Sequence, residues 1–535
     1  MSPRCLCLSV LLRIVKADTH IAPYFAKSIT PVFGLNHLGL RNAAEDLFTT
    51  LLPGLNGVTQ RVRYYSFYCW ITGQFYDQYT GPKKDIEEAY RLFIRKSEIL
   101  LALAQARRDP TVTGIPGITY ALSVLSHGHE TIDLLKCVDR PENPRRTNET
   151  YWANPGGILR QYYNSSMKDM ALLSGLQVIP SMSKPSDDSD NLPEGTILGK
   201  DLGVAFGESI GKGTAELFLA CVQHSRVSLA ELEAMKDNLV MKDFGDIGYE
   251  RELLIDTFNQ KDFPADENGE RFLRHDTIKL FLQYCKDGRR EGRDAIMFPT
   301  VTYEKILDGE ADDDCSLGWY AYHVNDRWQY HTSVIFSCLL EMLQKDGGWV
   351  AIKDIAERLA NGMYNALLSE PGMTLAQVCE LIDNGSISNL DFNKIEEEAA
   401  DAMVSLLKLY CENRNRLDII EAYKEAFREL RRSDFFSLMN ELDGLLDTPF
   451  ESFLAEFITT KIIYRHHTVS LMKYSATRVA SNKFLLEDGF IRFLEQTECS
   501  ATAPRIDSLI EYLTDLGLLK DMLPSPDAIE RYELN

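Results

Sequence analysis

The chain has 535 residues, 45% of them hydrophobic and 25% charged, which matches an ordinary globular protein and excludes a disordered one. This length predicts about two to four domains, with enough apolar residues for a core. The formal net charge of −22 disfavours a protein that coats duplex DNA, because phosphate contacts require Lys and Arg. Any nucleic-acid site would have to be a local basic patch on an acidic body.

The cysteines and the N-terminal residues indicate a reducing compartment. The eleven cysteines are scattered, include no C-x-x-C pair and mostly occupy apolar helical contexts, as expected of buried free thiols. The apolar run from Cys5 to Leu12 is short, and Arg13 and Lys16 follow it closely, so we expect no signal peptide. No run approaches the roughly 18 apolar residues of a membrane helix. We therefore predict a cytoplasmic protein without membrane contact.

Three helices are predicted early in the chain. In residues 40–52 the apolar positions follow the i, i+3, i+4, i+7 spacing of one helix face, and Pro53-Gly54 ends that helix. The next helix is expected at about residues 58–79 and a third at residues 85–107. A region punctuated by Pro and Gly follows them.

The remainder of the chain is also patterned for helices. Two capping-box pairs begin helices there: Ser228 with Glu231, and Thr374 with Gln377. The glycine pair Gly203 and Gly207 is more typical of helix packing than of phosphate binding. Near the C-terminus, short apolar runs on both sides of Asp488-Gly489 predict a β-hairpin.

These patterns predict a mainly α fold, a multi-helix globular body. The helix after Pro504 ends at Gly517-Leu518-Leu519, which resembles the end of a winged-helix module, a fold that serves DNA and protein contacts alike. A small C-terminal winged-helix-like subdomain is therefore one interpretation. The predicted domain order is a poorly specified lead-in at 1–30, an aromatic-rich helical domain at 31–180, a mobile polar loop at 181–195, a helical domain at 196–463 and the C-terminal subdomain at 464–535.

The most unusual stretch is residues 60–79, where two arginines precede eight aromatic residues in sixteen positions. Aromatic rings can stack on bases and Arg can hold phosphates, as in single-strand and flipped-base sites. The candidate nucleic-acid-binding residues here are Arg61, Arg63, Tyr64, Tyr65, Tyr68 and Trp70. The alternative is a core helix whose aromatic side chains pack inward and whose arginines pair with Glu45 or Asp46. The tyrosines disfavour this alternative, because each buried hydroxyl needs a partner.

A second dense cluster occupies residues 319–331 and contains two Trp, three Tyr, two His, an Asp and an Arg. A carboxylate such as Asp326 can activate water or stabilise a cationic sugar-like transition state, and His323 can shuttle a proton. The candidate catalytic residues are Asp326, His323 and Asp46, with Glu45 as a further rival, and Arg327 and Trp328 join the nucleic-acid-binding set. The alternative is a buried polar-aromatic seam in which Asp326 caps a helix that begins near Arg327.

A third set combines basic and aromatic side chains with a turn at residues 154–157. Its members are Arg145, Arg146, Tyr151, Trp152, Arg160, Tyr162, Tyr163 and Lys168. This set can form the second wall of a nucleotide-sized pocket, and an ordinary surface loop is the alternative.

Several common catalytic motifs are absent from the sequence. It has no H-E-x-x-H, G-x-S-x-G, P-loop or dinucleotide fingerprint, which disfavours ATP-driven, α/β-hydrolase and Rossmann classes. The adjacent His466 and His467 do not share a helix face and make a poor metal pair. We therefore expect neither a metal nor a cofactor.

The run from Pro53 to Trp70 resembles one in uncharacterised bacterial proteins encoded in phage-defence loci, and the stretch from Arg465 to Gly489 is similar as well. Together these stretches cover about a fifth of the chain. DNA glycosylases that excise modified phage bases are one class of defence protein that this chain resembles. The resemblance implies an anti-phage protein that acts on DNA, and it transfers no catalytic motif to individual residues.

Three functional hypotheses follow. The first is a bacterial defence DNA glycosylase that flips a modified base and leaves an abasic site, a reaction that needs neither ATP nor metal. The second is a non-enzymatic helical sensor or scaffold that binds a phage or host partner, which the net charge favours. The third is a metal-dependent nuclease whose acidic ligands are dispersed in the sequence.

Overall fold

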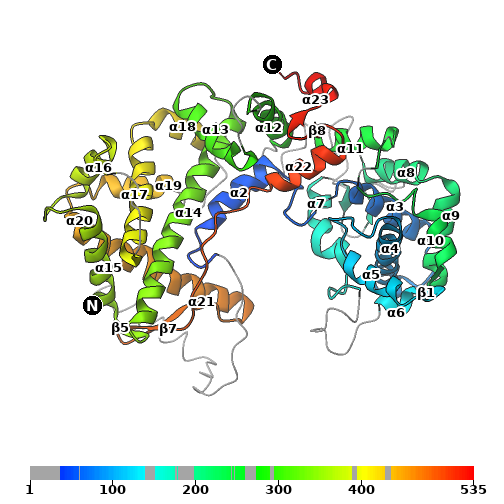
Figure 1. Ribbon diagram of the computed structural model, residues 1–535, viewed down its shortest axis with the longest axis horizontal. Coiled ribbons are helices and arrows are strands. Elements are labelled where there is room, and N and C mark those ends of the chain that lie inside the picture. Colours follow the sequence, from blue (N-terminus) through cyan, green and yellow to red (C-terminus); the bar gives the residue numbers. More distant parts are fainter. Residues whose placement is uncertain are drawn as a thin grey trace. The chain divides into compact units, whose positions relative to one another are not determined.

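The computed structural model describes residues 36–59, 61–138, 151–170, 172–174, 177–178, 198–242, 244–245, 247–259, 273–288, 294–387, 394–427 and 435–534 (Figure 1). The predicted lead-in at 1–30 and the predicted loop at 181–195 lie outside these ranges. Within them, α-helices predominate and the strands form only sheets of two or three strands, which confirms the mainly α class. No helix in these ranges combines the length and the apolar character needed to cross a membrane.

The chain forms two compact units, each assembled from three segments. Unit 1 comprises residues up to Gly39, Tyr330–Lys408 and Leu442–Ser500, and unit 2 comprises Leu40–Gln329, Leu409–Glu441 and Ala501–Asn535. The predicted boundaries differ from this division. In particular, the predicted C-terminal subdomain at 464–535 is shared between the two units, because residues 464–500 belong to unit 1 and the rest to unit 2.

Unit 2 begins with the three predicted helices, which the structure confirms as α2 (Arg41–Leu51), α3 (Arg63–Gln78) and α4 (Ile86–Arg108). The turn after α2 requires glycine at Gly54 for two reasons. Its φ is +76°, and a Cβ there would lie 2.5 Å from Cε of Met170.

Helix α3 packs closely against α8 (Gly199–Ser209). A Cβ on Gly203 would lie 2.9 Å from the backbone carbon of Cys69 and from the backbone nitrogen of Trp70. The absence of a side chain therefore lets the two helices approach backbone to backbone. The predicted packing role of the glycine pair is confirmed.

The other elements of unit 2 are short and mostly helical. Before α14 they are η1 (Lys83–Asp85), α5 (Ile118–Ser126), β1 (Thr131–Asp133), α6 (Leu134–Val138), η2 (Leu159–Tyr163), α7 (Asn164–Asp169), β2 (Leu173–Ser174), β3 (Gln177–Val178), α9 (Lys212–His224), β4 (Arg226–Ser228), α10 (Leu229–Met235), α11 (Tyr249–Asn259), α12 (Arg274–Gly288), η4 (Ala295–Met297) and α13 (Phe298–Leu307). Helices α14 (Asp314–Lys345), α17 (Ile395–Asn413) and α19 (Phe435–Asp443) contribute residues to both units, and α18 (Leu417–Ala426) belongs to unit 2.

Strands β1 and β4 pair antiparallel, and each leads directly into a helix. Ser228 ends β4 and forms the predicted capping box with Glu231 at the start of α10. Asp133 ends β1 in the same way, since its Oδ1 accepts hydrogen bonds from the backbone N–H of Leu135 and Lys136 at 3.0 and 3.2 Å. The side chain at each strand end thus satisfies the first turn of the next helix.

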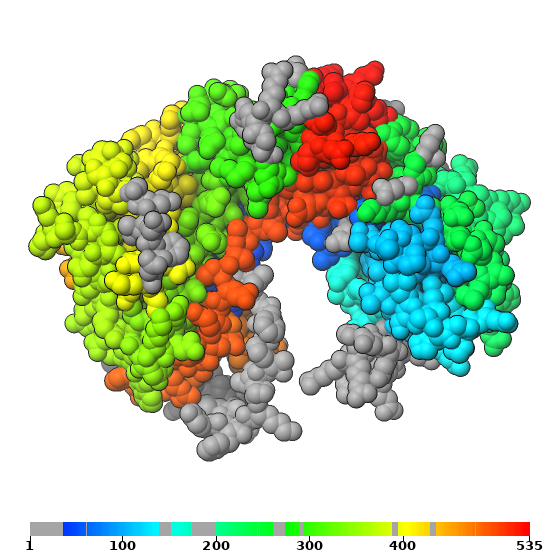
Figure 2. Space-filling model, in the orientation of Figure 1, coloured from blue at the N-terminus to red at the C-terminus, as the bar shows by residue number. Residues whose placement is uncertain are grey.

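The C-terminal elements of unit 2 pack against residues from the middle of the chain. They are α22 (Ile506–Asp515), β8 (Leu519–Lys520), β9 (Leu523–Pro524) and α23 (Pro526–Arg531). Figure 2 shows these residues, in red, lying against green residues of the same unit. Arg251 of α11 donates to the carbonyl of Leu516 at 2.8 Å and to Asp527 at 2.8 Å, so α11 is bonded to the end of α22 and to the start of α23.

Unit 1 combines helices with one three-stranded sheet. The helices that lie wholly within it are α15 (Ile352–Leu367), α16 (Leu375–Asp383), α20 (Phe450–Phe457), η5 (Ile458–Tyr464) and α21 (Arg465–Thr477). The sheet contains β5 (Trp349–Ala351), β6 (Phe484–Glu487) and β7 (Phe490–Phe493) in the order β5-β7-β6. Thr374 and Gln377 form the predicted capping box of α16.

The predicted β-hairpin is confirmed as β6 and β7. Asp488 and Gly489 connect these strands with φ values of +49° and +86°, the left-handed pair that a two-residue turn requires. The winged-helix-like interpretation combines residues of both units, because this hairpin belongs to unit 1 whereas α22 belongs to unit 2. The hairpin instead pairs with β5, which is distant in the sequence.

Candidate functional site

The aromatic side chains of α3 are part of the core of unit 2. Tyr64, Tyr65, Tyr68 and Trp70 are at most 5% exposed. Tyr64 and Tyr68 pack on the ring of Tyr163 with centroid distances of 5.4 and 5.2 Å. These contacts match the core-helix interpretation, and they leave these rings no open face on which a base could stack.

Two of the tyrosine hydroxyls that argue against this interpretation have partners from other elements. The Tyr65 hydroxyl donates to the carbonyl of Gly54 at 2.9 Å and accepts from the Tyr512 hydroxyl at 3.1 Å. The Tyr68 hydroxyl donates to Oε1 of Glu98 at 3.1 Å. The burial of these side chains therefore leaves their polar atoms satisfied.

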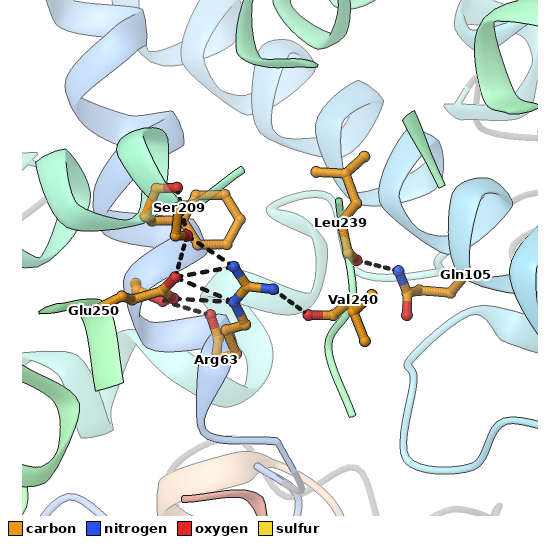
Figure 3. Close-up of polar contacts among 8 residues, drawn as sticks. Arg63, Gln105, Ser209, Leu239, Val240 and Glu250 are labelled. Atoms are coloured by element: carbon orange, nitrogen blue, oxygen red, sulfur yellow. Dashed lines mark hydrogen bonds and ion pairs between the residues drawn. The ribbon is translucent and has the colours of Figure 1, made fainter. Parts of the chain in front are cut away.

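Arg63 lies in a buried polar network rather than at a surface (Figure 3). Its Nε and Nη2 donate to the two oxygens of Glu250 at 3.1 and 2.9 Å, and Nη2 also donates to Oγ of Ser209 at 2.8 Å. Its Nη1 donates to the carbonyl of Val240, and the guanidinium lies 5.1 Å above the ring of Phe206. All three nitrogens are thus engaged within unit 2.

Arg61 is held by two carboxylates of α22. Its Nη1 lies 2.9 Å from Oδ1 of Asp515 and 2.6 Å from Oε2 of Glu511. The core-helix alternative paired the two arginines with Glu45 or Asp46, whereas residues far along the chain supply the partners that the structure shows. Burial raises the pKa of Asp515 to about 7, and the neighbouring Arg61 guanidinium offsets part of this effect.

Asp326 lies within α14 and anchors the C-terminal segment. Its Oδ1 accepts hydrogen bonds from the backbone N–H and the hydroxyl of Thr502, the first at 2.6 Å, and from Nε2 of Gln329 at 3.2 Å. The residue is 8% exposed. The interpretation of Asp326 as a helix cap is wrong, because α14 already begins at Asp314.

The other candidates around Asp326 also occupy packed positions. His323 is buried, stacks on Tyr303 with a centroid distance of 4.5 Å and has its Nδ1 3.5 Å from Oγ1 of Thr300. Trp328 is buried against Phe435, and Arg327 is half-buried. Asp46 is half-buried on another helix, α2. The structure therefore shows the buried polar-aromatic seam that was the alternative for residues 319–331.

A cavity of about 640 Å³ lies beside α5 in unit 2, and we call it the α5 pocket. Its lining residues are Ile115, Gly117, Ile118, Thr119, Tyr120, Ser123, Tyr151, Trp152, Ala153 and Gln161. Tyr151 and Trp152 belong to the set that the sequence associated with a nucleotide-sized pocket. Arg160 and Lys168 are exposed and absent from the lining, and Arg145 and Arg146 lie outside the described residues.

Sequence reasoning missed the α5 side of this pocket. The turn around Gly117 and the aromatic residue Tyr120 were the available signals. Gly117 has φ +77°, and a Cβ there would lie 2.1 Å from Cε2 of Tyr151, so the glycine lets this ring lie directly against the backbone. Because a glycine turn followed by an aromatic residue is common, this pattern alone does not predict a pocket.

The opposite wall of the α5 pocket is fixed to α4 by two buried charged residues. Glu98 accepts hydrogen bonds from the backbone N–H of Ile158 at 3.1 Å and of Leu159 at 2.8 Å, and burial raises its pKa to about 7. Arg95 donates to the carbonyl of Trp152 at 3.0 Å and to that of Val138 at 3.1 Å. The segment that carries Tyr151 and Trp152 is thereby held to the core.

Among the described residues, no group of three or more His, Cys, Asp and Glu side chains is arranged to hold a metal ion. Comparisons with protein-family models, with curated proteins and with solved structures find no match to this chain.

Proposed function

We propose that this chain is a non-enzymatic helical sensor or scaffold that binds a phage or host protein through unit 1. The observation that carries this proposal is an exposed aromatic pair on the sheet. Trp349 of β5 and Phe490 of β7 are 56% and 43% exposed, and their rings pack edge to face with a centroid distance of 5.9 Å. Exposed aromatic clusters are typical of protein–protein contact sites.

The surroundings of this pair suit a protein partner. A cavity of about 530 Å³ adjoins it, lined by Gln344, Gly347, Gly348, Trp349, Arg492 and Phe493. Strand β5 is a terminal strand of the sheet that the described residues form, so its outer edge can pair with an extended segment of another chain. Further exposed apolar side chains of unit 1 lie on α21: Leu471, Met472 and Tyr474.

The structural contacts of the candidate catalytic and DNA-binding residues also favour a non-enzymatic role. Asp326 and His323 are engaged in contacts that hold α14 to its neighbours, and Arg61 and Arg63 form ion pairs with buried carboxylates. Groups in such positions stabilise a fold, and reacting with a substrate would require them to leave these partners.

Site-specific photo-crosslinking tests this proposal. A photoreactive phenylalanine analogue replaces Phe490 in cells, before and during phage infection, and a matched analogue replaces Leu417, which is 65% exposed in unit 2. We expect a discrete adduct from position 490 that disappears when Trp349 is changed to Ala. Equal crosslinking from both positions, or none from position 490, would contradict a partner site on this sheet.

A second candidate function is the DNA glycosylase, which the α5 pocket favours. A pocket lined by Tyr120, Tyr151 and Trp152 has the aromatic walls that hold a flipped base. The lining residues that the structure describes include no carboxylate to assist cleavage of the glycosidic bond, which is why we place this function second.

The glycosylase candidate has a direct test. The purified protein is incubated with unmodified and modified phage DNA in the presence of a chelator, and the DNA is then treated with alkali. Strand breaks that appear only after alkali, only in modified DNA and not with a Trp152→Ala variant would support base excision. Intact DNA in every sample would reject the glycosylase candidate and leave the sensor or scaffold function. Full excision by an Asp326→Asn variant would exclude that residue from catalysis.

A further inference from the structure

We propose that the α5 pocket binds a neutral, planar nitrogen heterocycle of the nucleobase class. This inference goes beyond the sensor or scaffold function and does not depend on DNA cleavage. The volume of about 640 Å³ lies within the range of about 300–1,000 Å³ that small-molecule sites occupy. The ten lining residues in the described part of the chain are all uncharged, so these walls suit an uncharged ring better than a phosphate.

The walls of the pocket suit a flat ligand. Tyr120, Tyr151 and Trp152 supply three aromatic rings, with centroid distances of 6.2 Å between the two tyrosines and 6.1 Å between Tyr151 and Trp152. The rings are inclined to each other by 63° and 45°, so they do not stack in parallel on one another. A planar ligand can add the stacked contact that these rings lack among themselves.

The polar groups of the pocket suit the edge of a nucleobase. The indole N–H of Trp152 donates to Oε1 of Gln161 at 2.8 Å. This bond orients the Gln161 amide and leaves its –NH₂ group as a donor to a ligand carbonyl or ring nitrogen. The hydroxyls of Thr119 and Ser123 can both donate and accept. A ligand that presents donors and acceptors side by side, as a nucleobase does, matches this lining.

The pocket is formed before a ligand arrives. Gly117 allows Tyr151 to lie against the backbone, while Glu98 and Arg95 hold the segment that carries Tyr151 and Trp152. Preorganised walls reduce the entropy lost on binding. The same chemistry reaches the pocket from two sources, a free nucleoside or a base turned out of a nucleic acid.

Isothermal titration calorimetry on the full chain tests the proposal, with adenosine, guanosine, cytidine and thymidine as probes to millimolar concentration. We expect saturable binding of at least one nucleoside. Trp152→Ala and Gln161→Ala each should weaken it at least about tenfold, because stacking and the amide contact are lost. Ser123→Trp, which fills the pocket from the exposed side of α5, should abolish it. Tyr249→Ala and Gln223→Ala, at exposed positions of unit 2 away from the lining, are the controls.

Further ligands distinguish a free nucleoside from a base displaced from nucleic acid, and they define the results that would refute the proposal. Nucleoside 5′-monophosphates should bind no more tightly than the nucleosides, and binding by phosphorylated forms alone would overturn the neutral-ligand proposal. Single-stranded and mismatched duplex oligonucleotides that bind while all nucleosides fail would assign the pocket to a displaced base, provided that Ser123→Trp removes the binding. No binding of any probe by folded protein, or equal binding by the three pocket variants and the controls, would refute the proposal. Nucleoside binding without base release from DNA would support the pocket and reject the glycosylase.

Discussion

Arg63 and Glu250 form an ion pair whose side chains are 2% and 0% exposed. Their mutual attraction offsets the loss of hydration that each charge suffers in the interior, and Ser209 and the carbonyl of Val240 satisfy the remaining donors. Either charge left alone there would have no water to stabilise it. Loss of one partner therefore costs more free energy, through the unpaired buried charge, than the intact pair contributes to stability.

Removal of one charge of this pair should destabilise unit 2 strongly. We expect Glu250→Gln to lower its free energy of unfolding by about 3–5 kcal/mol, because Arg63 stays buried without a counter-charge. Denaturant unfolding followed by circular dichroism measures this change. The matched control is Glu216→Gln, whose exposed carboxylate lies 3.8 Å from Lys212 and should shift stability by less than about 1 kcal/mol. Similar losses in both variants would contradict the assigned role of the buried pair.

At the scale of elements, two glycines in neighbouring helices should respond oppositely to the same added methyl group. Gly203→Ala places a Cβ 2.9 Å from backbone atoms of α3, which cannot yield as a flexible side chain would. We expect a loss of about 1–3 kcal/mol from the displacement of α3 and α8. Gly213→Ala lies in α9 with no atom within 4 Å of its Cβ, and it should gain about 0.5–1 kcal/mol from helix propensity. Thermal unfolding midpoints decide between these signs, and a shift in the same direction for both would refute the close packing of α3 and α8.

A second prediction at this scale concerns two buried histidines of unit 1. Burial lowers the pKa of His37 to about 3 and that of His466 to about 4, from a usual value near 6.5. Below about pH 6.5 the unfolded chain therefore takes up protons that folded unit 1 does not. The resulting stability is complete above about pH 6.5 and decreases as the pH falls towards 4, by up to about 1.4 kcal/mol per pH unit for each histidine.

Amide hydrogen exchange can follow this acid effect locally. The backbone N–H of Lys483 donates to Nε2 of His466 at 3.0 Å, and protonation of that nitrogen abolishes the acceptor. We expect protection of the segment around Lys483 to decrease from pH 7 to pH 5 after correction for intrinsic exchange. Peptides from α4 in unit 2 serve as the reference. Unchanged protection around Lys483 would show that opening of this segment is not coupled to proton uptake by His466 between pH 7 and pH 5.

The elements that the sequence predicted are those whose signals are local. Helices α2, α3 and α4 follow from apolar periodicity and from the Pro53-Gly54 stop, and the β6–β7 hairpin follows from Asp488-Gly489. Strand β5 has only three residues, too few for an alternating pattern, and its partner β7 lies far along the chain. Such pairing is decided by tertiary contacts, which no local pattern contains.

The aromatic density of α3 illustrates the same limit at a candidate site. A helix rich in Tyr and Arg is compatible with a nucleic-acid surface or with a polar core, and the difference lies in whether buried partners exist. Those partners, Glu250, Asp515 and the carbonyl of Gly54, come from other elements of unit 2. The aromatic residues Tyr151 and Trp152 were identifiable from sequence, whereas their placement against Tyr120 depends on the fold.

At the scale of the whole molecule, unit 2 depends on a segment at the end of the chain. Deletion of residues 501–535 would remove Asp515 from Arg61, Thr502 from Asp326 and the Tyr512 hydroxyl from Tyr65. We expect unit 2 of the truncated protein not to fold, with rapid proteolysis and loss of cooperative unfolding as the measured results. Lys520→Ala, at an exposed position of β8 within the same segment, should behave as the unaltered protein. Survival of protease-resistant unit 2 after the deletion would contradict this dependence.

Arg61 and Asp515 are 454 residues apart in the sequence, so the ribosome makes Arg61 long before its partner. At about 5–20 residues per second, a ribosome needs on the order of 20–90 s to make the stretch between them. During that interval Arg61 and Tyr65 have left the ribosome, whereas their partners Asp515 and Tyr512 have not yet been made. Nascent chains of this protein should therefore require a holding chaperone, and premature termination should yield products that are degraded instead of shortened proteins that work.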